Sequence, residues 1–218
     1  MAASRWFSGK RVSIYYAPLH SRCAHESEKM SYDLILQTWR YWNERKYTTS
    51  FVPLINLKSF KTMKYGEEEI RVHFSTFTDH QDNERTIDKN FAVILGYSRK
   101  SMKELEALMK WLKYNHAYYK ERERFVEYIL LPIDSNEDED IDTEPEVITE
   151  IDKRARRIAG SYNILYFEKG CCPKTGENID YVFDYLVTAV MTSKYKDSKE
   201  TTDFASIQTN NNEICSFL

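Results

Sequence analysis

His20, Cys23 and His25 have the residue types and the close spacing of metal ligands. Imidazole and thiolate groups bind zinc, but a tetrahedral site takes four ligands and this group supplies three. His80 is a further imidazole that could orient a water molecule. An enzyme built on these histidines is one alternative, but the sequence assembles no nucleophile, base and oxyanion site around them. We therefore expect no metal site and no catalytic residue other than the candidate His80.

A second feature is the distribution of glycine along the chain. Residues 174–178 read Lys-Thr-Gly-Glu-Asn and run directly into an apolar segment at residues 179–186. A phosphate loop needs glycine, because only glycine turns successive backbone N–H groups toward an anion without a Cβ clash. No glycine lies between Gly9 and Gly66. The first half of the chain therefore lacks the residue type that binds phosphate.

Apolar patterns predict the elements that must position these residues. Strands are predicted at residues 11–16, 69–74, 91–97, 125–133 and 162–167, and residues 49–63 are predicted to form a hairpin with 69–74. Helical spacing predicts helices around residues 32–42, 101–112, 143–160 and 179–190. Ser101 and Glu104 are expected to cap the second helix, and Pro145 to lie in the first turn of the third, which Gly160 is expected to end. This order predicts an α/β sandwich of parallel strands joined by helical crossovers.

The segments at residues 91–97, 125–132 and 164–186, with the 174–178 loop, closely resemble the second half of Ras-like small GTPases of the Rab and Ras types. The resemblance extends over roughly residues 10–191. It implies a three-layer α/β/α G-domain with a six-stranded, mostly parallel sheet, one antiparallel edge strand and about five helices. We expect one such domain at residues 1–191 and a flexible polar tail at residues 192–218.

The residues that the resemblance would assign to phosphate and Mg²⁺ are largely replaced. In place of GxxxxGK[ST], residues 17–29 carry Lys29 near the expected position without the glycines. In the second switch Thr76 replaces the aspartate that helps hold Mg²⁺, and Asp79 replaces the glycine that meets the γ-phosphate. His80 replaces the glutamine that orients water. We expect no bound cofactor, and GTP or GDP with Mg²⁺ only if the chain is an atypical GTPase.

The guanine-reading motif is also altered. Asn136 replaces the aspartate that accepts two hydrogen bonds from guanine, and an amide mismatches that edge. Asp134 could take that role only after a shift of register. Lys174 is retained in the last loop, but Cys171-Cys172-Pro173 precedes it, so we expect the loop to serve as a turn and helix start. The chain is therefore expected to be a pseudo-GTPase adaptor; the alternative is an atypical GTPase that binds and weakly hydrolyses GTP.

Charge and the tail bear on partners and location. A net charge of −3 provides no global positive field for nucleic acid. No signal peptide or membrane-spanning run is evident, and the four cysteines suit reduced intracellular thiols. The last four residues, from Cys215, match a prenylation box, although Ser216 is not aliphatic. We expect protein effectors or regulators as partners, and a cytoplasmic protein tethered to a membrane through Cys215.

Overall fold

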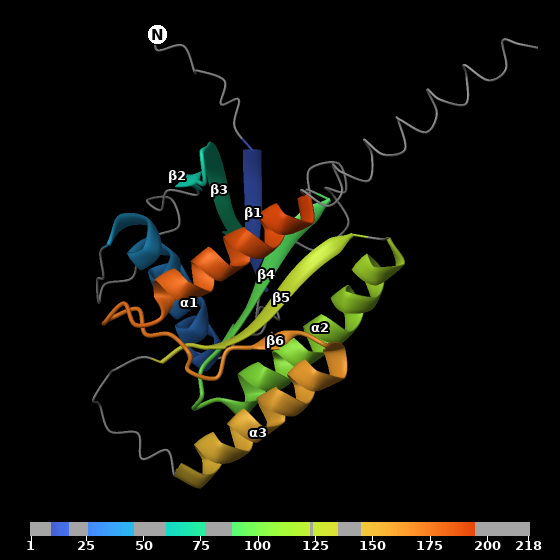
Figure 1. The fold of residues 1–218 in the computed structure, drawn as a ribbon. Coiled ribbons are helices and arrows are strands. Elements are labelled where there is room, and N and C mark those ends of the chain that lie inside the picture. The colour runs from blue at the N-terminus through green and yellow to red at the C-terminus, as the bar shows by residue number, and fades with distance from the viewer. Residues whose placement is uncertain are drawn as a thin grey trace, which may run out of the picture.

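The computed structural model describes residues 10–17, 26–45, 60–76, 89–122, 124–134 and 145–194, with only the backbone at residues 26–33 and 76. Along the chain the elements are β1 (Lys10–Tyr16), α1 (Glu26–Glu44), β2 (Phe60–Tyr65), β3 (Glu68–Thr76), β4 (Asn90–Tyr97), α2 (Met102–Glu121), β5 (Phe125–Pro132), α3 (Pro145–Tyr162) and β6 (Leu165–Tyr166). A last helix spans residues 179–194. Figure 1 shows these elements in chain order.

The strands form one six-stranded sheet in the order β2-β3-β1-β4-β5-β6. All neighbouring pairs are parallel except β2 and β3, which are antiparallel and place β2 at an edge. The β2–β3 connection is a two-residue turn in which Gly66 has a φ of 60°, a conformation that a Cβ atom disfavours. The predicted α/β class and the mostly parallel sheet with an antiparallel edge pair are confirmed.

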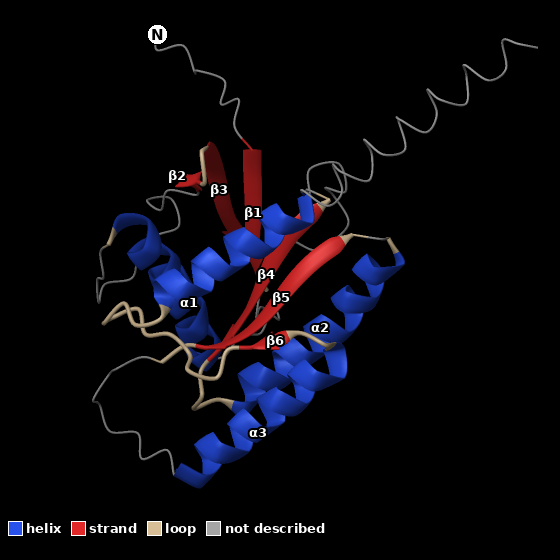
Figure 2. Ribbon diagram, viewed as in Figure 1, coloured by secondary structure: helices blue, strands red, loops and turns tan. Residues whose placement is uncertain are grey.

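Helices cover both faces of the sheet (Figure 2). On one face, α1 and the helix at residues 179–194 bury an aromatic cluster in which the Trp39 ring stacks on Phe74 at 4.7 Å and Trp42 stacks on Phe183 at 4.7 Å. On the other face, α2 and α3 pack over β4 and β5. Every residue of β4 is buried, as its continuous apolar run predicts for a central strand covered on both sides.

The helix ends follow local capping chemistry. Ser101 is the N-cap of α2, and its Oγ accepts a hydrogen bond from the Glu104 N–H at 3.3 Å. The Glu104 carboxylate is buried and accepts from the Ser98 N–H at 2.8 Å, so it secures the turn before the helix. α3 begins at Pro145 as predicted. Both predicted helix starts are thus supported by hydrogen bonding or by the fixed φ of proline.

The end of α3 differs from the prediction. The helix continues through Gly160 to Tyr162 and ends where Asn163 takes a φ of 52°. The Ile164 N–H then bonds the Ala159 carbonyl at 3.0 Å and the Asn163 N–H bonds the Gly160 carbonyl, the pattern of a Schellman motif. Asparagine tolerates this left-handed conformation, so Gly160 was not needed to end the helix. The last strand is correspondingly short, with β6 at Leu165–Tyr166 instead of residues 162–167.

Candidate functional site

The topology places the candidate site at the carboxyl edge of the sheet. β1 lies between β3 and β4, and the helices that follow β1 and β4 pack on opposite faces. In open α/β sheets, ligands bind in the crevice outside the carboxyl ends of the strands at such a reversal of strand order. The ends of β1 and β3 meet here, with Tyr16 opposite Thr76, and Ala17 donates its N–H to the Ile94 carbonyl at 3.0 Å. This edge is therefore the candidate ligand site.

Arg99 organises the described part of this edge. It follows β4 by two residues, and its Nη1 donates to Asp134 Oδ2 at 2.8 Å, just beyond β5. Its Nε donates to Asp152 Oδ1 of α3 at 3.3 Å, and its Nη2 donates to the backbone carbonyl of Glu168, after β6. One guanidinium thus connects the segments that follow three neighbouring strands to α3. We call Arg99, Asp134, Asp152, Tyr166 and the Glu168 carbonyl the Arg99 network.

Two phenols extend the Arg99 network into the core. The Tyr166 hydroxyl donates to Asp152 Oδ1 at 2.8 Å and accepts from the Tyr97 hydroxyl at 3.4 Å. Tyr97 is wholly buried, and burial raises the pKa of its hydroxyl far above the ordinary value. Burial likewise raises the pKa of Tyr166. Both phenols therefore stay protonated and act as hydrogen-bond donors.

Burial and neighbouring charges shift the pKa values of the ionisable groups in the Arg99 network. Burial disfavours the Arg99 guanidinium, but the carboxylates of Asp134 and Asp152 outweigh that effect and raise its pKa. Burial raises the pKa of the Asp134 carboxyl, and Arg99 opposes this shift. Asp152 adds to the rise, because its nearby negative charge disfavours the ionised form of Asp134. The guanidinium thus remains charged, and its N–H groups donate to groups of the protein itself.

The backbone at the expected guanine-reading position is hydrogen-bonded to β4 and to the last loop. Ile133 is 1% exposed, and its N–H donates to the Tyr97 carbonyl at 2.9 Å. The Asp134 N–H donates to the Cys171 carbonyl at 2.9 Å, and the Cys171 N–H donates to the Pro132 carbonyl at 3.0 Å. The apolar side chain of Ile133 thus occupies the first position of the expected guanine-reading motif. The Asp134 carboxylate, at the second position, is bonded to Arg99.

The last loop is a compact turn. The Gly176 N–H bonds the Cys172 carbonyl at 2.8 Å, and the φ of Gly176 is +78°. A Cβ on Gly176 would lie 2.1 Å from the Tyr41 ring, so only glycine lets the loop approach α1 so closely. Cys171 is buried, and burial raises the pKa of its thiol well above the ordinary value. Lys174 is exposed at the surface of this turn.

Several predicted site residues lie outside the described residues or lack a described side chain. Lys29 lies in α1 and Thr76 ends β3, and only their backbones are described. The described ranges do not include Asp79, His80, Asn136, Cys215, or the predicted ligand group of His20, Cys23 and His25. Within the described ranges, no three His, Cys, Asp or Glu residues are grouped to hold a metal ion.

Sequence reasoning missed Arg99, Asp152 and Tyr166. The available signal was the position of Arg99, two residues beyond a continuous buried strand, at the edge where parallel strands carry functional side chains. Asp152 resembled an ordinary exposed residue of an amphipathic helix. Its pairing with Arg99 depends on the packing of α3 against the sheet, which the local pattern does not reveal.

Comparison with models of known protein families finds no match for this chain, and comparison with curated proteins finds none either. Among the described helices, none combines the length and the apolar character that crossing a membrane requires.

Proposed function

We propose that the chain is a Ras-like pseudo-GTPase that binds protein partners at the cytoplasmic surface of a membrane and has no nucleotide cycle. The six-stranded sheet with one antiparallel edge pair supports the G-domain part of this proposal, because it has the strand composition that the resemblance implies. The close turn at Gly176, directly before the last helix, supports it as well.

The observation that carries the proposal is the Arg99 network. In a nucleotide-binding α/β domain, the ligand lies in the crevice outside the carboxyl ends of the strands and contacts the loops that follow them. Here Arg99 connects the segments after β4, β5 and β6 and occupies the Asp134 carboxylate. A polar group that is already hydrogen-bonded gains little from a ligand, and breaking its bond leaves a costly unsatisfied partner. This bonding supports the proposal that the segments after β4, β5 and β6 do not need a nucleotide to hold them.

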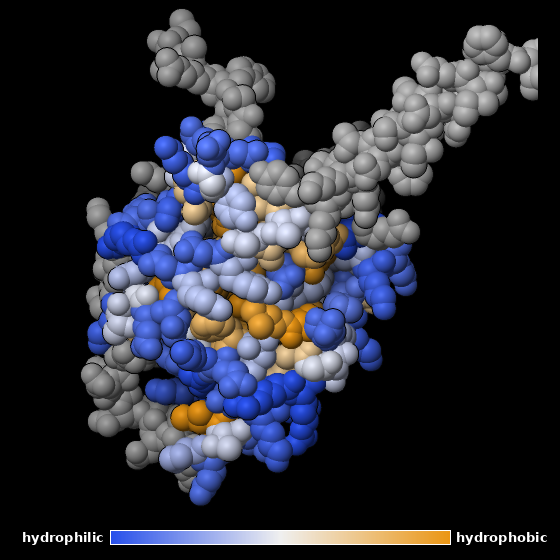
Figure 3. Space-filling model, in the orientation of Figure 1, coloured by the Kyte–Doolittle hydropathy of each residue, from blue (hydrophilic) through white to orange (hydrophobic). Residues whose placement is uncertain are grey.

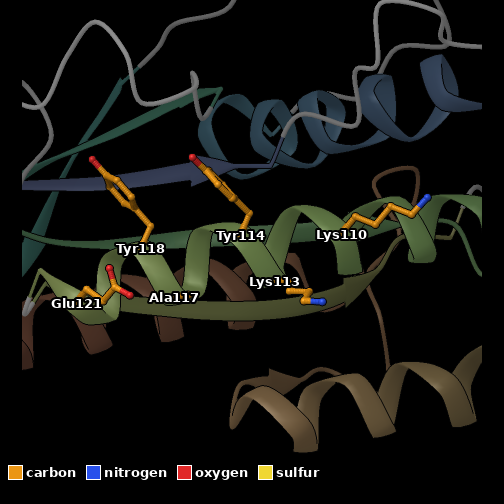
Figure 4. Close-up of a pocket in the computed structure, with 6 residues that line it drawn as sticks. All are labelled: Lys110, Lys113, Tyr114, Ala117, Tyr118 and Glu121. Atoms are coloured by element: carbon orange, nitrogen blue, oxygen red, sulfur yellow. The ribbon is translucent and has the colours of Figure 1, made fainter.

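A surface of α2 supports a role in protein binding. Tyr114 and Tyr118 extend in the same direction from α2, one turn apart, and Lys110 lies one turn further along (Figure 4). Tyr114 is 65% exposed, and the Arg122 guanidinium lies 3.5 Å from the centroid of the Tyr118 ring. Tyrosine and arginine are enriched at protein interfaces. Elsewhere, the face in Figure 3 is largely hydrophilic, with a narrower hydrophobic band in its centre.

Calorimetric titration of the purified full chain tests the proposal. GTP, GDP and ATP are each added in buffer that contains Mg²⁺, and we expect no saturable binding. Binding of a guanine nucleotide with a Kd of about 1 μM or tighter would favour the alternative, an atypical small GTPase that binds and weakly hydrolyses GTP.

A further inference from the structure

The outward face of α3 carries a group of unpaired cations. Lys153 and Arg157 are exposed and lie one helical turn apart, and Arg154, which is partly exposed, flanks them. Within the described part of the chain, none of these three side chains has a hydrogen bond, an ion pair or a ring contact. α3 lies at the periphery of the molecule, with the sheet and α2 on its inner side (Figure 1). We call the three residues the α3 basic face.

Neighbouring acidic side chains do not neutralise the α3 basic face. Glu150 lies one turn before Lys153 and Arg154, at spacings that allow an ion pair on a helix, yet the described residues form no such pair. Arg156 does have a partner, Glu168 at 3.3 Å, and is therefore not part of this face. The three unpaired charges remain available to a group from outside the chain.

The helix dipole does not account for the position of these cations. A cation stabilises a helix when it lies in the last turn, beside the last carbonyl groups. The last turn of α3 contains no basic residue. Lys153 and Arg157 are like charges four residues apart, an arrangement that weakens a helix.

Gly160 extends the same face by a further turn. It follows Arg157 by three residues, is exposed, and a Cβ there would meet nothing within 4 Å. Packing therefore does not require glycine at this position, although glycine in a helix interior weakens the helix. A glycine does let a bound chain approach the helix backbone closely. The outward face thus combines two features that reduce stability and that serve no contact among the described residues.

The spacing of the two exposed cations fits the carboxylates of a peptide. Lysine and arginine donate strong hydrogen bonds to carboxylate oxygens. Four residues of helix place Lys153 and Arg157 about 6 Å apart along the axis of α3. Alternate side chains of an extended strand are about 6.6 Å apart. An extended peptide with an acidic residue at every second position therefore meets both cations.

The first half of α3 favours a short peptide over a larger anionic surface. Glu146 and Glu150 are exposed on the same outward face, two turns and one turn before Lys153. An anionic membrane or a nucleic acid that lay along α3 would also contact these two carboxylates and be repelled by them. A short peptide crosses the second half of the helix and avoids them.

We propose that the α3 basic face is a docking site for an acidic peptide segment of a protein partner. The segment lies in extended form across the second half of α3. Its carboxylates pair with Lys153 and Arg157, Arg154 adds a charge at its flank, and its backbone lies close to Gly160. This inference rests on the proposed role in protein binding, and it gives that role a surface and a partner chemistry. The nucleotide titration and the peptide titration below can each fail alone, because this face shares no residue with the carboxyl edge of the sheet.

Fluorescence anisotropy of labelled peptides, titrated with the full chain, tests the proposal. The probes are a peptide of alternating glutamate and serine and its counterpart with glutamine in place of glutamate. Low ionic strength is used, because salt screens exposed ion pairs. We expect saturable binding of the acidic peptide and at least about tenfold weaker binding of the glutamine peptide. Absence of saturable binding of the acidic peptide would overturn the proposal.

Two competitors test the class of the partner. Vesicles that contain phosphatidylserine and a single-stranded polyuridylate RNA are each added to the complex of the chain with the acidic peptide. We expect neither to displace the peptide at an equal concentration of negative charge. Displacement by either competitor would overturn the assignment of a peptide as the partner.

Matched variants locate the peptide on α3. The first variant neutralises the α3 basic face through Lys153→Gln, Arg154→Gln and Arg157→Gln. It should bind the acidic peptide about tenfold or more weakly, because three ion pairs are lost. Its stability in urea should be at least that of the wild type, because no contact among the described side chains is lost and repulsion between like charges in α3 is relieved.

The control variant removes the same number of exposed charges from α2, through Lys103→Gln, Lys110→Gln and Lys113→Gln. It should bind the acidic peptide as the wild type does. Equal affinity of the wild type and both variants would contradict the proposal, and a loss in the control alone would place the peptide on α2 instead.

Discussion

At Arg99 a single side chain holds together segments that are far apart in sequence. Its side chain is 18% exposed, and the carboxylates that it bonds come from residues 35 and 53 positions later in the chain. A partly buried ion pair of this kind is costly to break from one side, because the remaining partners keep their desolvation without their bonds. The guanidinium of Arg99 is therefore the group on which the network depends, because all three of its partners would lose a bond with it.

Arg99→Met removes that guanidinium and keeps most of the apolar stem. We expect a loss of about 2 kcal/mol in the free energy of unfolding, because Asp134 and Asp152 lose their cationic partner. Arg156→Met is the control. It breaks an exposed pair with Glu168, 60% and 58% exposed, and should cost less than about 0.5 kcal/mol. Urea denaturation measures both values, and equal losses would contradict the role of the Arg99 network.

His116 gives the fold a pH dependence of known sign. Burial lowers the pKa of His116 below its ordinary value of 6.5, and the nearby Lys120 ammonium lowers it further, against a backbone hydrogen bond with Tyr162. Between the lowered pKa and 6.5, the unfolded chain binds a proton at His116 that the folded chain does not bind. The contribution to stability is therefore present above this window and is lost as the pH falls through it.

Comparison of the wild type with His116→Gln isolates this effect. The free energy of unfolding of the wild type should fall more steeply than that of the variant between about pH 7.5 and about pH 5. Urea denaturation across this range, without added anions, makes the measurement. Parallel curves for the two proteins would show that His116 titrates alike in the folded and unfolded chains.

At the scale of elements, two glycines differ in whether the fold requires glycine at their position. Gly160 lies inside α3, and a Cβ there would meet nothing within 4 Å. Gly170 follows β6 with a φ of +65°, and a Cβ there would lie 2.8 Å from the Pro132 carbonyl oxygen and 3.3 Å from the Arg99 and Asp134 side chains. The first position has no need of glycine, and the second depends on it.

Alanine substitutions should separate the two positions. Gly160→Ala should stabilise the fold by about 0.5–1 kcal/mol, because glycine in a helix interior costs backbone entropy. Gly170→Ala should destabilise it by about 2 kcal/mol, because alanine is strained at positive φ and would displace the Arg99 network. Thermal unfolding of both variants reports the two signs. A loss of stability in Gly160→Ala would contradict the observed course of α3.

The elements themselves were largely predictable, for physical reasons that differ along the chain. The continuous apolar run of β4 and the helical spacing of Ile35, Trp39 and Trp42 each reflect burial that the sequence records locally. The end of α3 was not predictable in this way, because glycine and asparagine both tolerate the left-handed conformation that ends a helix, and the structure has it at Asn163 and not at Gly160. The Arg99 network was missed because its partners come together only when α3 and β6 pack beside β5.

At the scale of the whole molecule, membrane attachment of the proposed adaptor rests on Cys215, which lies outside the described residues. Cys215→Ser removes the thiol that would carry a prenyl group and should leave the stability of the folded part unchanged. Since one lipid anchors only marginally, we expect partial membrane association of the wild type and a further loss in the variant. Fractionation of cells that express each form makes the comparison. Equal distribution of the two forms would mean that the C-terminal box is not used.

The central claim is that this α/β domain exists without a guanine nucleotide. The Arg99 network connects the segments after β4, β5 and β6, and the segment after β1 lacks the glycines that cradle phosphate. The most direct test is to purify the full chain in Mg²⁺ buffer without added nucleotide, denature it and quantify the released guanine nucleotides by chromatography. We predict that no stoichiometric GTP or GDP is released from a fully folded protein. Release of close to one guanine nucleotide per chain would contradict the pseudo-GTPase proposal.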